Sequence, residues 1–218
     1  MIANSSATPS ASSIAESENL LAASVKRVAN RLGVPAPRLE QYLPSRDDLF
    51  ELMLDVALGE VKLADAPDDA DWRAQLAELA EATYTLACQH PWLVELIGGR
   101  PPSGPNGLRY VERALTAFAR TGLDPTTAAL CFNAVLSYVS GCVRTEVQYK
   151  DPMAGDRAED KARYLTDTIS GADYPYLSAL LSDSANVTND ASFAHGLACL
   201  LDGIALRVEA VAAVRSAP

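Results

Sequence analysis

One stretch constrains the fold of this 218-residue sequence more than any other: SVKRVANRLGVPAPRLEQYLPSRDDLFELML, residues 24–54. Its first part has apolar residues at helical spacing, at Val25, Val28, Ala29 and Leu32. Gly33 follows directly, and glycine is a common residue just after the C-terminal end of a helix. We therefore expect a short helix from Ser24 that stops at Gly33.

The second part of the stretch predicts another short helix and then a long one. The inward-facing residues of the second helix are expected to be Leu39, Tyr42 and Leu43. Pro44 ends this helix, and Ser45 is a suitable N-cap for the next one, with Asp47 and Asp48 in its first turn. Two short helices joined by a glycine turn have the outline of a helix-turn-helix.

The rest of the chain is also expected to be helical. Aromatic residues make up 6% of the sequence, long stretches of Ala, Leu and Val have a helical period, and strand signals are almost absent. Further helices are expected over residues 71–91, 92–99, 107–122, 124–150 and 191–214, with Asp124 as N-cap and Pro125 at the first helical position of the fourth. Residues 1–19 are expected to be a frayed tail with at best a short helix near residues 14–21. Residues 151–163 are interpreted as a charged linker or the start of another helix.

Charge and cysteine content limit the partners of the chain. A net charge of −10 disfavours a polyanionic partner unless basic residues cluster locally. The four cysteines are interpreted as buried small hydrophobes in a reducing compartment, without metal-site spacing: Cys88, Cys131, Cys142 and Cys199. No apolar run reaches the length of about 18 residues that crosses a bilayer, and the first residues lack the order of a signal peptide. These features predict a cytoplasmic protein without a membrane segment or a metal.

The order of these elements resembles the tetracycline-repressor (TetR) family. SVKRVANRLGV resembles the second helix and turn of that family, and YLPSRDDLFELMLD resembles the end of its recognition helix and the start of its fourth helix. HPWL, GPN and FAHGLACLLDGI, which begin at residues 90, 104 and 193, resemble landmarks of one class of its ligand-binding domains. The resemblance implies an all-α homodimer whose N-terminal helices read operator DNA and whose C-terminal domain binds a hydrophobic small molecule.

The resemblance divides the chain into three parts. Residues 1–23 are expected to be a poorly ordered tail or a degenerate first helix. Residues 24–66 would form a helix-turn-helix-like head and its connecting helix. Residues 67–218 would form the helical domain for ligand binding and dimerisation.

The expected DNA-reading surface departs from the family pattern. Where the family commonly has SPMALYRH, this chain has PAPRLEQY, so Glu40 and Gln41 stand in place of a phosphate-contacting tyrosine and a basic residue. A carboxylate repels phosphate, and Pro35 and Pro37 remove backbone donors from the end that approaches DNA. If DNA binding is retained, the expected contacts are Lys26, Arg27, Arg38, Gln41 and Tyr42. The alternative is that the cations of residues 24–46 form an ordinary solvated face.

Candidate ligand-binding residues lie mainly on the helix over residues 124–150. Five of its residues fall on one stripe at 3.6 residues per turn, namely Cys131, Tyr138, Cys142, Thr145 and Tyr149. Such a stripe suits a pocket wall for a polycyclic molecule, and it suits a core or dimer interface equally well. Arg144 interrupts the apolar helix and would orient a carboxylate or enolate, pair with neighbouring charges or face solvent. Trp92, in the HPWL stretch, is also expected to line the ligand site.

The leading hypothesis from these departures is that operator binding has been lost and the ligand domain repurposed. His195 and Tyr138 would then be the catalytic residues of a cyclase, isomerase or dehydratase in natural-product biosynthesis. Nucleotide, phosphate-loop and metal motifs are absent, so such an enzyme would use no cofactor. The alternative is a conventional ligand-responsive repressor of the TetR type. A protein-interaction module is a third possibility.

Overall fold

A computed structural model describes residues 2–62, 71–97, 102–149, 163–164, 167–169, 174–182 and 189–216. Every regular element in this part of the chain is a helix, which confirms the all-α prediction. The head contains α1 (Ile2–Ser17), η1 (Leu20–Ala22), α2 (Val25–Leu32) and α3 (Ala36–Glu40). Next come α4 (Arg46–Leu58), α5 (Trp72–Gln89), η2 (Pro91–Glu95), α6 (Pro105–Ala117), α7 (Pro125–Tyr149), α9 (Pro175–Ser182) and α10 (Asn189–Ser216).

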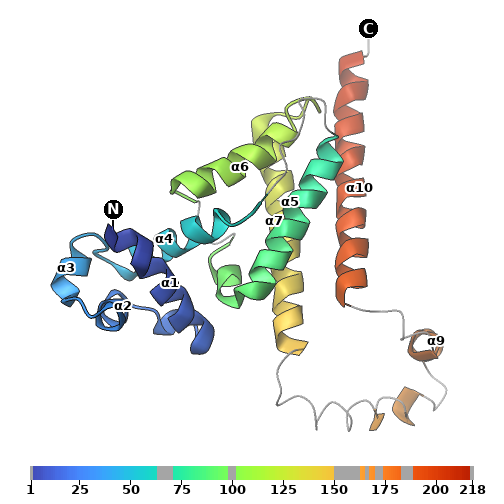
Figure 1. Cartoon of the computed structure of the whole chain (residues 1–218). Coiled ribbons are helices and arrows are strands. Elements are labelled where there is room, and N and C mark those ends of the chain that lie inside the picture. The colour runs from blue at the N-terminus through green and yellow to red at the C-terminus, as the bar shows by residue number, and fades with distance from the viewer. Residues whose placement is uncertain are drawn as a thin grey trace.

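The helices form a small head and a larger body. In Figure 1 the head lies at one side, α4 leads from it into the body, and α5, α6, α7 and α10 make up the body. Helices α5 and α7 pack against each other, and α10 packs on both. The expected boundary between residues 66 and 67 and all of the expected linker at 151–163 except its last residue lie outside the described residues.

The first helix is longer than the sequence suggested. We expected a poorly ordered tail or a degenerate first helix, with at best a short helix near residues 14–21, but α1 covers Ile2–Ser17 and packs against α2 and α4. Its inner face is apolar, and the buried residues of that face are Ala7, Ala11, Ile14 and Ala15. Pro9 lies inside the helix but faces solvent. Tertiary burial of this face therefore outweighs the low helix propensity of the serines and the proline.

Two helix starts agree with the sequence pattern. Ser45 caps α4, because its hydroxyl accepts from the Asp48 amide (3.1 Å) while the Asp48 carboxylate accepts from the Ser45 amide (2.8 Å). Asp124 accepts from the amides of Thr126 (3.0 Å) and Thr127 (3.1 Å) at the start of α7. Pro125 is the first residue of α7, as predicted.

Helix α7 corrects the expectation about apolar length. Its segment Pro125–Val147 is long and apolar enough to cross a membrane by length and composition alone. The core helix of a helical bundle passes the same test, so the finding is weak evidence for a span. Here the inner residues Phe132, Val135, Val139 and Val143 are buried in the body.

Candidate functional site in the head and at the α4–α6 junction

The head holds a helix-turn-helix. The Ser24 hydroxyl accepts from the amide of Arg27 (3.4 Å) at the start of α2, and Gly33 ends α2 with a left-handed φ of 66°. That backbone angle favours glycine, which confirms the predicted stop. Val25, Val28 and Ala29 form the buried face of α2.

The recognition segment is short and starts with prolines. Pro35 is the N-cap of α3, which ends at Glu40. Prolines fit this first turn because its amides have no helical partner. Leu39 and Leu43 are buried as predicted, but Tyr42 is 61% exposed, so the expectation that it points inward is wrong. Tyr42 lies beyond the end of α3, where the helical period no longer applies.

The predicted DNA contacts divide into one engaged residue and a set of exposed ones. Arg27 donates to both carboxylate oxygens of Glu18 and to the Ala22 carbonyl, and this contact lowers the pKa of Glu18. Arg27 is itself exposed, and so are the other four candidates, Lys26, Arg38, Gln41 and Tyr42. Lys26 and Arg38 form no ion pair with the described residues. Glu40 is exposed on the same segment.

A buried carboxylate joins the connecting helix to the body. Asp55, near the end of α4, accepts from the backbone amides of Asn106 and Gly107, both at 2.8 Å, and from the Asn106 side chain at 3.2 Å. These amides belong to the first turn of α6, which lacks a local side-chain cap because Gly104 occupies the N-cap position. Asp55 therefore supplies the cap from another helix. Its negative charge also interacts favourably with the positive end of the α6 dipole.

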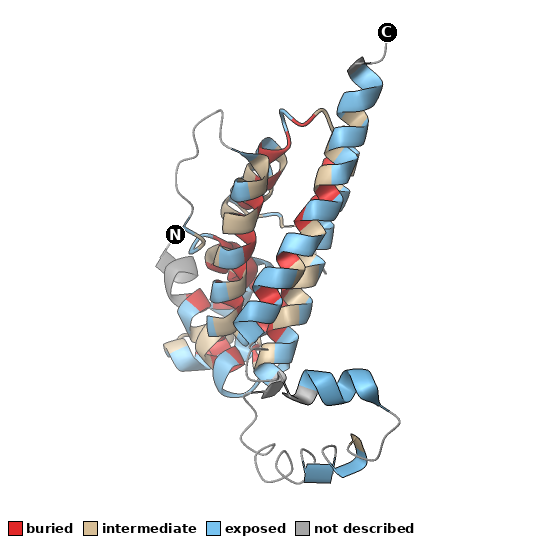
Figure 2. Cartoon of the chain, turned by 90° about the vertical axis from the view of Figure 1, so that its right-hand side faces the viewer, coloured by how far each residue is buried: buried red, intermediate tan, exposed pale blue. Residues whose placement is uncertain are grey.

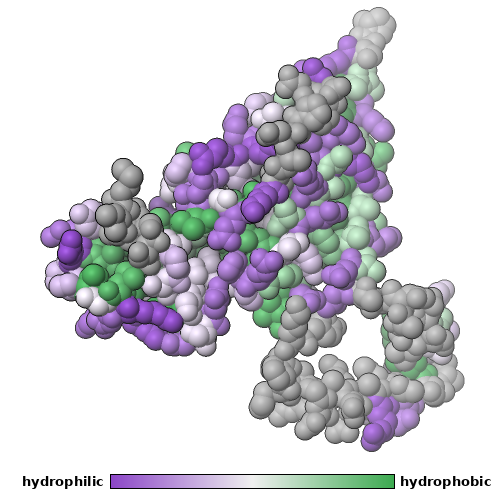
Figure 3. Space-filling view, in the orientation of Figure 1, coloured by the Kyte–Doolittle hydropathy of each residue, from purple (hydrophilic) through white to green (hydrophobic). Residues whose placement is uncertain are grey.

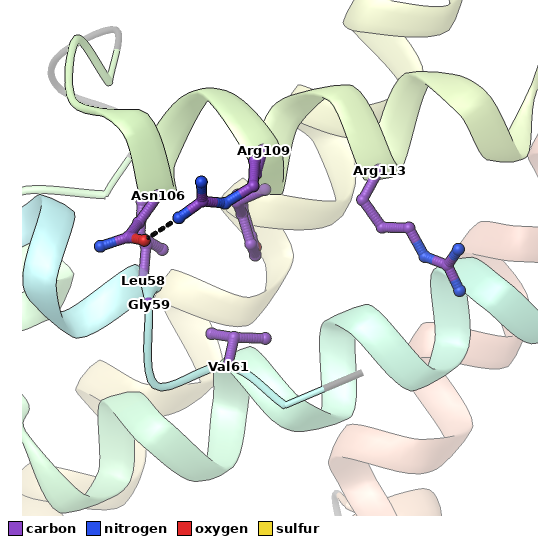
Figure 4. A pocket seen from close by; sticks show the side chains of 7 residues that line it. Leu58, Gly59, Val61, Asn106, Arg109 and Arg113 are labelled. Carbon is purple, nitrogen blue, oxygen red and sulfur yellow. Dashed lines mark hydrogen bonds between the residues drawn. The ribbon is translucent and has the colours of Figure 1, made fainter. Parts of the chain in front are cut away.

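A cavity of about 190 Å³ adjoins this junction. It lies between the end of α4, the segment after α4 and one face of α6, and its lining is Leu58, Gly59, Val61, Asn106, Arg109, Tyr110 and Arg113. Figure 4 shows Arg109 and Arg113 extending from successive turns of α6, with Arg109 donating to Asn106. The lining thus combines the apolar side chains of Leu58 and Val61 with the polar side chains of Asn106, Arg109 and Arg113.

Tyr110 anchors this wall of the cavity in the core. Its hydroxyl lies 2.8 Å from that of Thr83, which in turn donates to the Leu79 carbonyl (2.7 Å). Its ring packs against Phe132, with centroids 5.7 Å apart. Burial raises the pKa of the Tyr110 hydroxyl, so this hydroxyl stays protonated.

The predicted stripe on α7 faces α5 and α10 at its centre. The Tyr138 hydroxyl donates to the carbonyls of Ser192 (3.0 Å) and Phe193 (2.9 Å) on α10. Its ring stacks on Phe193, whose other neighbour is Tyr84 of α5. Cys131 is buried and Cys142 half-buried, Thr145 is exposed, and the side chain of Tyr149 lies outside the described residues. Burial is the main cause that raises the pKa of Tyr138. This packing suits the core alternative.

The other candidates lie apart from the α4–α6 cavity. His195 is exposed on α10, with Nε2 3.7 Å from the Cys199 sulfur. Cys199 is also exposed, so the expectation of buried cysteines is wrong there. Trp92 and Arg144 come together at a different cavity. Sequence reasoning missed Asp55, Arg109 and Arg113; a single aspartate within the apolar run LFELMLDVAL was the available signal.

A helix-turn-helix head joined through a capped helix junction to a helical body is the architecture that the resemblance to the TetR family predicts. Residues 64–208 match the family described as "Tetracyclin repressor-like, C-terminal domain". The chain belongs to this family.

Relatives and solved structures agree with this assignment. HTH-type transcriptional repressor DrrR1 of Streptomyces coeruleorubidus is 28% identical over 201 residues, covering 89% of this chain and 74% of that protein. An HTH-type transcriptional regulator of Saccharopolyspora erythraea is 29% identical over 154 residues, covering 71% and 64%. The structure of ActR from Streptomyces coelicolor in complex with actinorhodin is 24% identical, covers 94% and 97%, and has a TM-score of 0.79.

These findings overturn the repurposing hypothesis. The relatives are named as transcriptional repressors and regulators, so loss of operator binding and a change to lyase, isomerase or cyclase activity are not supported. The physical reason is in the head: the departures at Pro35, Pro37 and Glu40 leave the helix-turn-helix scaffold intact. The relatives therefore give no support to the doubt about DNA binding, and the alternative of a ligand-responsive regulator agrees better with them.

Proposed function

We propose that this protein is a ligand-responsive transcriptional regulator that binds operator DNA through α2 and α3. The observation that carries the proposal is the Asp55 cap, because it ties the helix that supports the head to the helix that walls a cavity. A ligand that displaces the start of α6 would move Asp55, and α4 would carry this movement to the head.

The size of the cavity supports this coupling. At about 190 Å³ it is smaller than the roughly 300–1,000 Å³ of typical ligand pockets, so a shift of α6 would enlarge the space for a ligand. Arg109, Arg113 and the Asn106 amide favour a ligand with acceptor groups, and Leu58 and Val61 favour an apolar body. A natural-product-like molecule with rings and carbonyl or carboxylate oxygens has this chemistry.

A homodimer is part of the proposal. Figure 2 shows that much of the outward face of α10 is exposed. Large apolar side chains exposed on α9 and α10 are Tyr176, Leu177, Leu180, Leu206 and Val214. Figure 3 shows hydrophobic residues next to hydrophilic ones along α10. A second copy would cover this face and place two heads on one operator, as two-fold helix-turn-helix proteins do. A regulator of this kind acts in the cytoplasm, where the DNA is.

Salt-dependent binding to the DNA upstream of the protein's own gene tests the proposal. Fluorescence anisotropy is expected to show sequence-specific binding that weakens as salt rises. Arg38→Ala should weaken binding and reduce the salt slope by about 1 per protomer contact. Arg120→Ala removes an exposed cation from the body and is the matched control. Binding that is absent, or equally affected by both variants, would contradict the proposal.

A further inference from the structure

A second cavity, of about 300 Å³, lies where the head meets the body. The head contributes Ala15, Asn19 and Leu20, and the body contributes Pro91, Trp92, Val94, Glu95, Val143, Arg144 and Val147. These residues belong to α1, the segment at η1, η2 and the end of α7. None of them lines the α4–α6 cavity, so the two cavities are separate sites.

The indole of Trp92 has an unmet hydrogen bond beside this cavity. Trp92 is 4% exposed, and its Nε1 is buried without a partner among the described residues. A buried donor without an acceptor costs about 1–3 kcal/mol, and native proteins rarely leave one unpaired. An acceptor atom in the cavity would relieve this cost if the ring turns its Nε1 toward it.

Two further donors belong to the same lining. Arg144 is exposed and forms no hydrogen bond or ion pair with the described residues. The Asn19 side-chain oxygen accepts from the Ala22 amide (2.9 Å), which leaves the amide nitrogen of Asn19 as a donor. Against these donors the lining has one carboxylate, Glu95. The lining therefore has no formal net charge, and its one cation, Arg144, together with the two neutral donors, can bind one carboxylate group.

The other residues of the lining determine the chemistry of the rest of such a ligand. Ala15, Leu20, Val94, Val143 and Val147 are apolar, and they come from both the head and the body. Close by, Nδ1 of His90 lies 2.7 Å from a carboxylate oxygen of Glu16 on α1, and Nε2 of His90 lies 3.8 Å from a carboxylate oxygen of Glu60. Polar contacts therefore already join the head to the body near this cavity. A molecule in the cavity would contact the same two parts.

We propose that this cavity between the head and the body is a second small-molecule site, for compact carboxylic acids with an apolar ring. The carboxylate binds Arg144, with Asn19 and the Trp92 indole as further donors, and the ring lies on the valine and leucine side chains. This proposal does not depend on the α4–α6 cavity beside Asp55, nor on DNA binding.

Titration of the full-length protein with 2-naphthoate tests the site by nuclear magnetic resonance. The two tryptophans give two indole N–H signals, and a Trp72→Phe variant assigns them. The Trp92 signal is expected to shift saturably, with a larger change than that of Trp72. Neutral 2-naphthamide should bind about tenfold more weakly, because it lacks the charge that Arg144 recognises.

Paired arginine variants locate the binding. Arg144→Gln, at an exposed position, is expected to weaken naphthoate binding about tenfold or more while both indole signals keep their positions in the free protein. Arg113→Gln, in the other cavity, should leave the Trp92 titration unchanged. An unshifted Trp92 signal at millimolar naphthoate would overturn the site. So would a titration that Arg144→Gln does not alter, or one that Arg113→Gln abolishes.

Discussion

A Cβ atom on Gly104 would lie 2.2 Å from Cγ of Asp55. The chain at the start of α6 thus approaches the connecting helix as closely as a residue without a side chain allows. We expect Gly104→Ala to lower the free energy of unfolding by about 1–3 kcal/mol, since Asp55 must shift and its bonds to α6 weaken. Gly141→Ala is the control, because nothing lies within 4 Å of its added Cβ on α7. Urea unfolding of both variants checks this; equal stability would contradict the close packing.

Removing the carboxylate itself should be more damaging. Asp55→Ala leaves the amides of Asn106 and Gly107 without their acceptor, and we expect a loss of about 2–4 kcal/mol. Glu51→Gln is the control one turn earlier on α4, where an exposed carboxylate accepts from the Ser103 hydroxyl; we expect a change below about 0.5 kcal/mol. Chemical denaturation measures both. A similar loss for both would mean that Asp55 acts only through its charge.

The acidic residue on the recognition segment should weaken DNA binding. Glu40 is exposed on α3, and its charge repels nearby phosphates. Glu40→Gln is therefore expected to tighten operator binding by about two- to tenfold at low salt, and less at high salt. Glu112→Gln on α6 is the control. Anisotropy titrations at two salt concentrations measure the effect; unchanged affinity would place Glu40 away from the phosphates.

Tyr138 is expected to stabilise the packing of α7 on α10. Tyr138→Phe keeps the ring stack with Phe193 and loses the hydrogen bonds to α10, so stability should fall by about 1 kcal/mol. Operator affinity of the folded protein should stay unchanged. Thermal unfolding and anisotropy measure the two quantities. The structural role fails if the variant is as stable as the original protein but has altered DNA binding.

Acid should weaken the start of α7. Hydrogen bonds from Thr127 and then Thr126 lower the pKa of Asp124, so the folded state favours its charged form. The stabilisation is therefore present above the ordinary aspartate pKa of about 3.9 and is lost as pH falls through the lower folded value. Asp124→Asn keeps a capping oxygen but does not titrate. The difference in melting temperature between the two proteins should shrink between about pH 6 and pH 3. A constant difference would contradict this.

Local signals predicted the helices well and the site poorly. Gly33, Ser45, Asp124 and Pro125 each act on adjacent backbone, so their effects follow from sequence spacing alone. The α4–α6 site depends on Asp55 meeting an amide 51 residues away, which no local pattern reports. Helix α1 was underestimated for the same reason, because its alanine face is stabilised by α2 and α4.

Glu40 shows how a single position misleads. Glu40 departs from the family pattern at a position where contact with phosphate is expected. The residues that hold the helix-turn-helix together, such as Val25, Val28 and Gly33, are nevertheless present. A single substitution on the DNA-facing surface changes the affinity for DNA by a limited amount. The packed helices beneath that surface determine whether the surface forms at all. The names of the relatives agree with the scaffold and not with the departure at Glu40.

The Asp55 cap also has a consequence for how the chain folds. The first turn of α6 has a glycine and a proline where a local cap would stand. Its amides are therefore capped only when Asp55, on a helix that is synthesised earlier, packs against them. Body and head therefore share a long-range contact whose formation closes a large loop. A fragment ending after α4 would leave Asp55 without donors, and a fragment beginning at α5 would leave α6 uncapped. The two halves are expected to unfold as one cooperative unit and not as separable modules.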